Sequence, residues 1–268
     1  MISTISQNSS SNVSENHKIA LIFDLDGTLL DSINLVSIYF YNEFPKRFNV
    51  SWDETIAKEI ESYVLGMIQG KSSPILILKA LNWISDYFHF GFFTKLRFNK
   101  ELGNYYKENI SKVPLFEGAY DAVKNLSLLP NILTCMNTSS SKKEVAQRFK
   151  GREKLLDMFS GPFITRDKVK NLKPNPDSIL LIHKSTKIPL SNMIMIGDME
   201  IDIMAGKNTG IYTIGVTCGH LKEKEFEALN VDLIFRDVKE LADNIDKILE
   251  YISNNPPKPM PSNIPRNN

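Results

Sequence analysis

Short runs of apolar residues, each of about strand length, alternate along this chain with segments whose apolar residues recur at helical spacing. The runs are continuous, which is typical of strands that are buried on both faces of a parallel sheet. Five of them stand out, at residues 19–23, 131–136, 193–196, 211–216 and 232–235. Helical patterns occupy residues 119–128, 142–149, 176–184 and 238–251. This alternation predicts right-handed βαβ units and therefore an α/β fold with a mostly parallel sheet.

One long interval breaks the alternation. Between about Ile33 and Lys112 the apolar and aromatic residues fit several amphipathic helices, and no run there is convincing as a strand. We expect the aromatic residues 87–93 to belong to the core of this helical insert, with His89 packed among them. Because the insert begins directly after the first strand, it is expected to lie over the carboxyl edge of the sheet, as a lid would.

The two ends of the chain differ from its middle. The first residues are rich in Ser and Asn and lack the basic start and apolar centre of a signal peptide, and the last ones are rich in Pro, so both ends are expected to be disordered. The expected organisation is a disordered lead-in at 1–17, a core domain at 18–32 and 113–252, a helical cap at 33–112, and a disordered tail at 253–268.

Composition and charge narrow the class of protein. Of the 268 residues, 42% are hydrophobic and 24% are charged, as in an ordinary soluble globular protein. A formal net charge of +1 argues against nucleic acid or an anionic membrane as a partner, and no apolar run has the roughly 20 residues that a membrane span needs. Two cysteines, Cys135 and Cys218, suggest no disulfide framework and fit a reducing, cytoplasmic compartment.

The first strand ends in a pair of aspartates, Asp24 and Asp26, followed by Gly27 and Thr28. Residues two apart on extended backbone point the same way, so we expect both carboxylates at the carboxyl edge of the sheet, where open α/β sheets carry their chemistry. Two like charges are costly there unless a cation or a shared proton compensates them. The pair therefore suggests a metal site, proton transfer or both, although a polar turn with a helix N-cap would use the same residue types.

Further polar side chains follow later strands or precede helices. They are Asn137 and Thr138, Lys173, and Asp198 with Asp202. All are predicted at the same edge of the sheet as the aspartate pair. Taken alone, the lysine would be solvated and the two later aspartates would serve as turn and cap residues. His220, which follows the fourth apolar run, is interpreted as structural.

Three motifs occur in order: Asp-Leu-Asp-Gly-Thr at 24–28, Lys-Pro-x-Pro-Asp at 173–177 and Gly-Asp-x-x-x-Asp at 197–202. In order and context they resemble the motifs of the haloacid dehalogenase (HAD) superfamily, specifically members with a C1-type helical cap between the first and second motifs. Phosphoglycolate phosphatases and β-phosphoglucomutases are similar in layout. The resemblance covers about Lys18 to Tyr251 and implies a Rossmann-like core with an inserted α-helical cap.

The resemblance implies a role for each catalytic motif residue. Asp24 would be the nucleophile that forms an aspartyl-phosphate, and Asp26 would be the acid and base, with its pKa raised by a neighbouring carboxylate. Lys173 would neutralise the phosphate and the nucleophile as a point charge. Thr28 and nearby backbone amides would hold phosphoryl oxygens.

The resemblance also implies a Mg²⁺ ion, because a hard cation reduces the repulsion between the phosphate and the nucleophile. Its protein ligands would be Asp24, the backbone carbonyl of Asp26, and Asp198. Asp202 would orient the site or its waters from behind these ligands.

The second motif departs from the family pattern. HAD phosphatases usually have Thr or Ser at this strand end, commonly followed by Asn, whereas this chain has Met136, Asn137 and Thr138. One register places Asn137 at the phosphate, where its amide would donate a hydrogen bond, and another places Met136 there, which has no donor. Thr138 would take this position if the strand ended one residue later.

We therefore expect a Mg²⁺-dependent phosphatase that hydrolyses a small phosphorylated metabolite, as a monomer or homodimer without nucleic-acid or membrane partners. The alternatives are a phosphomutase on the same scaffold, and a weakly active or non-catalytic HAD-fold binding protein, which the unusual second motif suggests. Substrate choice would lie in the cap. There Gly70 and Lys71 either form a loop that reaches the site or mark a helix end with an exposed lysine.

Overall fold

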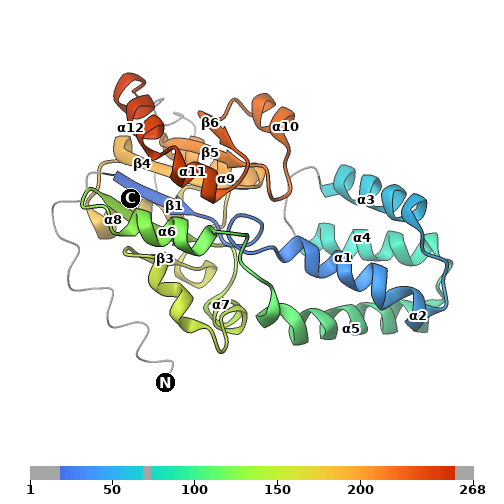
Figure 1. Cartoon of the computed structure of the whole chain (residues 1–268). Helices are drawn as coiled ribbons and strands as arrows, with labels where there is room; N and C mark the ends of the chain where they lie inside the picture. The colour runs from blue at the N-terminus through green and yellow to red at the C-terminus, as the bar shows by residue number, and fades with distance from the viewer. Residues whose placement is uncertain (1–18, 69–73, 257–268) are drawn as a thin grey trace. The chain divides into compact units, whose positions relative to one another are not determined.

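The computed structural model describes residues 19–68 and 74–256 of the chain (Figure 1). Its backbone divides into two compact units: a core unit, Met1–Asp31 with Pro114–Asn268, and a helical unit, Ser32–Val113. Three expectations fall outside the described residues: the lead-in at 1–17, most of the tail at 253–268, and the cap loop at Gly70 and Lys71.

Within its described residues the core unit contains a six-stranded sheet, ordered β3-β2-β1-β4-β5-β6, in which every pairing is parallel. The strands are β1 (Ile19–Phe23), β2 (Ile132–Asn137), β3 (Phe163–Ile164), β4 (Met193–Gly197), β5 (Tyr212–Val216) and β6 (Leu233–Phe235). The helices are α6 (Ala119–Ser127), α7 (Lys142–Arg148), α8 (Asp177–Thr186), α9 (Glu200–Thr209), α10 (Glu223–Ala228), α11 (Val238–Asp243) and α12 (Ile245–Asn254). The predicted α/β fold with a parallel sheet is confirmed.

Strand β1 lies at the centre of the sheet, with β2 on one side and β4 on the other. Ile22 is in register with Cys135 of β2 and with Met195 of β4. The strand order reverses at β1, and ligands of open α/β sheets bind at the carboxyl ends of strands where this reversal occurs. The sheet therefore places the residue after β1, Asp24, at the position that this architecture favours for chemistry.

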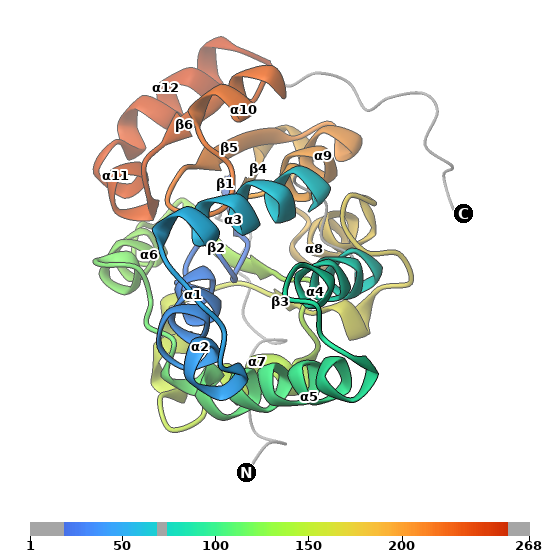
Figure 2. The ribbon, with the colours of Figure 1, turned by 90° about the vertical axis from the view of Figure 1, so that its right-hand side faces the viewer.

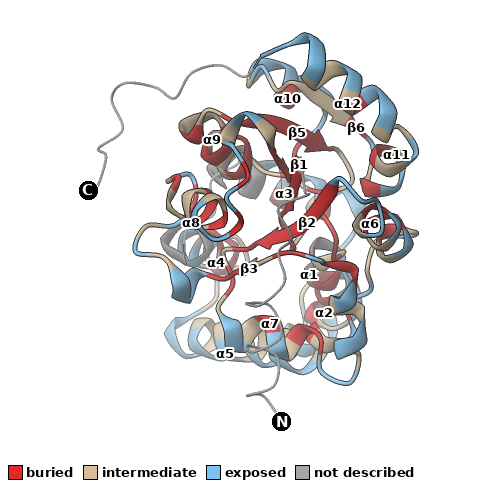
Figure 3. Cartoon of the chain, turned by 90° about the vertical axis from the view of Figure 1, so that its left-hand side faces the viewer, coloured by how far each residue is buried: buried red, intermediate tan, exposed pale blue. Residues whose placement is uncertain are grey.

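Helices cover both faces of the sheet. On one face Ile22 and Met195 pack with Ile182 of α8 and Ala205 of α9, and α6 and α11 lie on the other face (Figure 2). The strands are almost entirely buried, whereas the outer surfaces of the helices are exposed (Figure 3). Burial on both faces explains why the strands have continuous apolar sequences rather than alternating ones.

Two elements differ from the sequence prediction. Strand β3 was not predicted, because two residues carry too little pattern, and it forms by pairing with Met136 and Asn137 of β2. Residues 238–251, predicted as one helix, form α11 and α12, which meet at Asn244. The side-chain amide of Asn244 donates to the Glu240 carbonyl at 2.9 Å and so ends the first helix. Helix α12 then continues to Asn254, so the first two residues of the expected tail are helical.

The chain enters and leaves the helical unit through neighbouring segments of the core unit. The Asp31 amide donates to the Pro114 carbonyl at 3.0 Å, and the Phe116 amide donates to the Leu29 carbonyl at 2.9 Å. A further bridge joins Leu30 to Leu115 in antiparallel fashion. These contacts form a short two-stranded neck.

Every element described in the helical unit is a helix, as predicted. The elements are α1 (Ser32–Asn42), α2 (Phe44–Phe48), α3 (Glu54–Ile68), α4 (Pro74–Tyr87), α5 (Phe92–Asn109) and a short 3₁₀ turn at Ile110–Lys112. Its core is aromatic and includes the fully buried Tyr39, Phe44 and Phe98. None of the helices that the structure describes is both long and apolar enough to cross a membrane.

The aromatic residues 87–93 only partly form this core. Phe88 and Phe90 pack against it, as expected. His89 is exposed and has a φ of 54°, so the expectation that it is packed was wrong. Phe92 and Phe93 are 70% and 82% exposed, because they lie in the first turn of α5, on the side away from the helix's buried residues.

Candidate active site

The turn after β1 brings main chain against the end of β4. The Asp24 amide donates to the Ile196 carbonyl at 2.9 Å, so the main chain at Asp24 is still hydrogen-bonded to β4. The chain then turns at Gly27, whose φ of 84° is rarely adopted by residues with a side chain. A Cβ atom at Gly27 would lie 2.2 Å from Oδ2 of Asp198. Glycine is therefore required both by the turn and by the close approach of Asp198.

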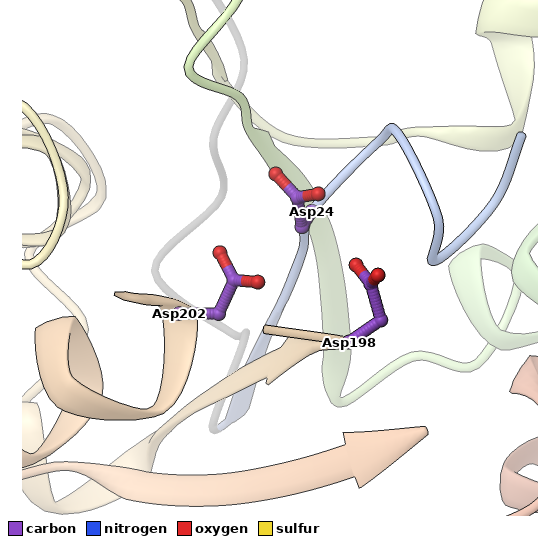
Figure 4. A group of neighbouring side chains, drawn as sticks. All are labelled: Asp24, Asp198 and Asp202. Carbon is purple, nitrogen blue, oxygen red and sulfur yellow. The ribbon is translucent and has the colours of Figure 1, made fainter. Parts of the chain in front are cut away.

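Three buried carboxyl groups converge at this edge of the sheet (Figure 4). Asp24 follows β1, Asp198 follows β4, and Asp202 lies in the first turn of α9. One oxygen from each lies within 4.8 Å of the other two. The three residues are 7%, 0% and 1% exposed, respectively. Asp202, expected to act from behind the metal ligands, contributes its carboxylate to the same cluster as the two predicted ligand aspartates.

Lys173 lies between two of these carboxylates. Its Nζ atom donates to Oδ1 of Asp24 at 2.5 Å, to Oδ1 of Asp202 at 2.5 Å and to the backbone carbonyl of Asn137 at 3.1 Å. The loop that carries it is fixed to α9, because the side-chain amide of Asn208 donates to the Pro174 carbonyl at 3.0 Å. The lysine side chain is 3% exposed, so the alternative of a solvated lysine does not apply.

Burial dominates the titration of this cluster. It raises the pKa of Asp24 well above its ordinary value, and although Lys173 opposes this, the neighbouring carboxylates add to it. Burial likewise raises the pKa of Asp202 against the attraction of Lys173. Burial acts to lower the pKa of Lys173, but the two aspartates outweigh it and raise that pKa above its ordinary range. The lysine is therefore charged, and its charge does not offset the effect of burial on the pKa values of Asp24 and Asp202.

The cluster fits a divalent cation. It sets the single ammonium of Lys173 against three buried carboxyl groups, and buried charge is stable only when it is compensated. The converging ligand atoms are all carboxylate oxygens, which hard cations such as Mg²⁺ prefer. The chemistry of the donor set therefore matches the cofactor that the sequence led us to expect.

Asp198 is held by donors on both of its oxygens. Thr28 Oγ1 donates to Oδ1 at 3.0 Å, while the backbone amide and Nδ1 of His220 lie 3.0 and 2.6 Å from Oδ2. Burial acts to lower the pKa of His220, but the hydrogen bond to Asp198 outweighs it and raises that pKa. Thr28, expected to bind phosphoryl oxygens, orients Asp198 in this structure, and His220 has a position in the site that we did not predict.

Asp26 lies beside a different set of groups. Arg148 Nε donates to its Oδ1 at 2.8 Å, and Ser140 Oγ donates to its Oδ2 at 3.1 Å. Its side chain is 27% exposed, more than those of the three clustered aspartates. The hydrogen-bond partners of Asp26 are thus a guanidinium and a hydroxyl group, which the sequence argument did not predict.

The structure shows where strand β2 ends within the second motif, Met136–Asn137–Thr138. Strand β2 ends at Asn137, which is 1% exposed. Its carbonyl accepts the bond from Lys173, while its side-chain amide nitrogen lies 3.8 Å from the sulfur of Met195. Thr138 Oγ1 accepts a bond from the Ser140 amide at 3.1 Å. Of the registers left open, the structure has the one in which Asn137 is the last strand residue, and Asn137 faces the site through its main chain.

Sequence reasoning missed three residues of the site: Ser140, Arg148 and His220. Serines in a loop and a basic residue in the last turn of a helix are ordinary features, and a lone histidine has no motif. Arg148 reaches Asp26 across 122 residues of sequence, so no local pattern announces the pair. The sequence gives no signal for His220 either, although in the structure a Cβ atom at the preceding Gly219 would lie 2.3 Å from the Asp198 side chain.

Proteins of known sequence resemble this chain. The sequence profile of the haloacid dehalogenase-like hydrolase family matches residues 21–216. A phosphorylated carbohydrates phosphatase from Thermotoga maritima is 25% identical over 195 residues, which are 73% of this chain and 83% of that protein. A phosphoglycolate phosphatase from Vibrio parahaemolyticus is 23% identical over 239 residues, which are 87% of this chain and 95% of that protein.

Solved structures extend the likeness to the fold. A crystal structure from Thermotoga maritima, provisionally named a beta-phosphoglucomutase, matches with a TM-score of 0.68 at 19% sequence identity. The match covers 86% of this chain and 99% of that one. At this level of identity the comparison shows a shared fold.

Proposed function

The chain belongs to the haloacid dehalogenase-like hydrolases, and on that basis we propose that it is a Mg²⁺-dependent phosphatase that hydrolyses a small phosphorylated metabolite through an aspartyl-phosphate. Relatives named as phosphatases support the broader class, a phosphoric monoester hydrolase. The finer statement, a Mg²⁺-dependent reaction through Asp24, is supported by the site.

One observation carries the proposal. Lys173 Nζ lies 2.5 Å from an oxygen of Asp24 and 2.5 Å from an oxygen of Asp202, and Asp198 completes a buried cluster beside them. An ordinary structural ion pair needs one carboxylate for one lysine, and three buried carboxyls would be a poor way to stabilise a fold. Such an arrangement is suited to a site that binds a cation and the charged phosphoryl group.

The residues then have distinct roles in the proposed reaction. An oxygen of Asp24 attacks phosphorus, the bond from phosphorus to the substrate oxygen breaks, and Asp26 gives that oxygen its proton. Water next attacks phosphorus, Asp26 takes a proton from that water, and inorganic phosphate leaves with Asp24 restored. Lys173 holds Asp24 in place throughout and offsets negative charge.

Asp24, Asp198 and the backbone carbonyl of Asp26 would hold the Mg²⁺ ion, with Asp202 orienting the site. When bound, the ion supplies positive charge next to the phosphoryl oxygens. Thr28 and His220 fix the two oxygens of Asp198, so this carboxylate needs little rearrangement to serve as a ligand. We assign no phosphate contact to the side chain of Asn137, and leave that role for Thr138 and the backbone amides that follow β2.

The remaining expectations are part of the same proposal. Residues 18–32 and 113–252 would act as the catalytic core and residues 33–112 as a cap that governs the substrate. A cytoplasmic location is supported by the two cysteines, Cys135 and Cys218, which are both free thiols. A small phosphorylated metabolite as substrate and a monomer or homodimer as assembly complete the proposal.

A phosphomutase is the second candidate, favoured by the fold shared with the protein provisionally named a beta-phosphoglucomutase. A mutase would return the phosphoryl group from Asp24 to the substrate rather than to water. Release of inorganic phosphate over many turnovers therefore separates the two reactions.

The decisive experiment measures phosphate release from phosphorylated sugars, short acids and nucleotides, with and without Mg²⁺, for the wild type and Asp24→Asn. We expect Mg²⁺-dependent turnover of at least one substrate class and a fall of about 10³-fold or more in Asp24→Asn, because the nucleophile is lost.

Asp157→Asn is the matched control. Asp157 is an exposed aspartate that accepts from the Tyr120 hydroxyl and pairs with Lys124, away from the cluster. It should keep wild-type turnover. Equal activity of Asp24→Asn and the wild type would refute the proposal.

A further inference from the structure

A buried guanidinium lies beside the proposed acid and base. Arg148 stands in the last turn of α7, and its side chain is only 7% exposed. Arginine stays charged in proteins, so it is rarely buried without a partner. Its Nε atom donates to Oδ1 of Asp26 at 2.8 Å. A buried positive charge therefore contacts the Asp26 carboxylate directly.

A second donor holds the other oxygen of Asp26. Ser140 Oγ donates to Oδ2 at 3.1 Å, and Ser140 is 8% exposed. The main chain of Ser140 is itself fixed, because its amide donates to Thr138 Oγ1 and its carbonyl accepts from the Arg166 amide. Both oxygens of Asp26 are thus tied to the β2–α7 segment, which is far from Asp26 in sequence.

The orientation of Asp26 matters because proton transfer requires the carboxyl group to lie within hydrogen-bond distance of the leaving oxygen. On its own the side chain has freedom about χ1 and χ2, and it directly precedes Gly27, at which the chain turns. Two donors with fixed positions remove this freedom. A planar guanidinium also directs its N–H bonds in fixed directions, which a lysine at this position would not do.

We propose that Arg148, together with Ser140, is a positioning residue that holds the Asp26 carboxyl group for proton transfer to the leaving oxygen. This inference rests on the proposed role of Asp26. It has a consequence that a purely structural ion pair lacks, since the need for a proton depends on the substrate. An alkyl phosphate releases an alkoxide that must be protonated, whereas 4-nitrophenyl phosphate releases an anion that is stable in water.

The test compares these two substrates in Arg148→Met, which keeps an unbranched apolar side chain and removes the guanidinium. For the best alkyl phosphate we expect kcat/KM, which covers the steps up to release of the alcohol and not the later attack of water, to fall about 10–100-fold, since general acid–base catalysis contributes factors of this order or more. For 4-nitrophenyl phosphate kcat/KM should fall less than about 3-fold, whereas kcat falls with both substrates because Asp26 is also the base toward water. In Arg148→Ala, added methylguanidinium should restore part of kcat/KM for the alkyl phosphate and leave kcat/KM for the aryl phosphate unchanged.

Arg166→Met is the matched control. Arg166 pairs at 3.0 Å with Glu144 of α7, the helix that also carries Arg148, and the Arg166 side chain is 44% exposed. The Arg166→Met variant removes a guanidinium near α7 that does not contact Asp26. Any change in kcat/KM should therefore be the same for the alkyl and the aryl phosphate. If Arg148→Met does not fold, as judged by its thermal unfolding, Ser140→Ala removes the second donor and should show a smaller loss with the same preference for the aryl substrate.

The outcomes separate this inference from the proposed function. Retained activity in Asp24→Asn would refute the proposed function, and an unaffected alkyl phosphatase rate in Asp26→Asn would refute the role of Asp26. If Asp26→Asn lowers kcat/KM for the alkyl phosphate while Arg148→Met leaves it unchanged, or if Arg148→Met lowers kcat/KM for both substrates equally, then Arg148 does not position Asp26 and this inference alone fails.

Discussion

At the residue scale, Gly27 shows how the sequence makes room for the site. Its φ of 84° carries the chain out of β1, and the missing side chain leaves the space that Asp198 fills. The two requirements have different costs. The backbone conformation costs a non-glycine residue about 1–2 kcal/mol, whereas the overlap with Asp198 displaces a carboxylate that the proposed reaction needs.

Gly27→Ala should therefore lose both stability and activity. Gly151 offers a matched control, because its φ of 79° is similar but a Cβ there would meet nothing within 4 Å. We expect Gly151→Ala to cost about 1–2 kcal/mol in urea unfolding with unchanged turnover. Gly27→Ala should cost more and abolish phosphate release. Equal losses in the two variants would show that the contact with Asp198 does not matter.

The residues of the site also show what a sequence can and cannot reveal. The motif aspartates and Lys173 were predicted at one edge of the sheet, and the structure brings Asp24, Lys173 and Asp198 together. The positions of the aspartates follow from strand ends, and that of Lys173 from the start of a helix, and a local pattern can locate both. Arg148 and His220 could not be found in this way, because their importance lies in contacts that only the assembled sheet creates.

At the scale of elements, the C-terminal helices show how caps divide one amphipathic segment into two. The apolar spacing of residues 238–251 continues through Asn244, so periodicity alone predicted one helix. The break depends on side-chain hydrogen bonds. Asp237 begins α11 by accepting from the Glu240 amide at 2.8 Å, and Asn244 ends it. Strand β3 was missed for a related reason, since pairing with β2 rather than its own pattern defines it.

The cap at Asp237 should make the stability of this region depend on pH. Burial acts to raise the pKa of Asp237, but the Glu240 amide and the Arg236 guanidinium outweigh it and lower that pKa below its ordinary value of 3.8. The folded pKa is depressed, so this stabilisation is present above 3.8 and is lost as the pH falls through the folded value.

We expect Asp237→Ala to cost about 0.5–2 kcal/mol in urea unfolding at neutral pH, and the deficit to shrink below pH 3.8. Asp237→Asn keeps an acceptor without the charge, so its smaller deficit should vary less with pH. A deficit of Asp237→Ala that stays constant down to the acid transition would contradict this account.

At the scale of the whole molecule, the core unit combines a well-buried sheet with a cluster of buried charges that opposes folding. Its strands are buried on both faces, yet three carboxyl groups and one lysine are buried at their carboxyl ends. Charges buried in this proportion oppose folding unless a ligand completes them. Binding of a cation to the folded form alone would therefore stabilise the protein by mass action.

Mg²⁺ should accordingly raise the unfolding temperature, and a chelator should reverse the shift. At a Mg²⁺ concentration about 100-fold above Kd the expected gain is about 2.7 kcal/mol. Asp198→Asn should show little or no shift, because it removes a carboxylate that the proposal assigns to the ion, whereas Asp157→Asn should shift like the wild type. Calorimetric scans of the three proteins with Mg²⁺ or a chelator measure this directly, and an equal shift in Asp198→Asn would place the bound ion elsewhere.

The two-stranded neck at Asp31 and Pro114 brings the two ends of the helical insert together. The chain leaves the core unit after Asp31 and re-enters it at Pro114, and these two residues are joined by a hydrogen bond of 3.0 Å. The two ends of the inserted segment therefore lie next to each other. An insertion attached in this way can be lengthened, shortened or exchanged during evolution without altering the path of β1 or the turn that follows it. Under the proposed function, substrate preference would then be inherited with the insert. The phosphoryl chemistry would be inherited with the core unit, whose strands β1 and β2 lie before and after the neck in sequence.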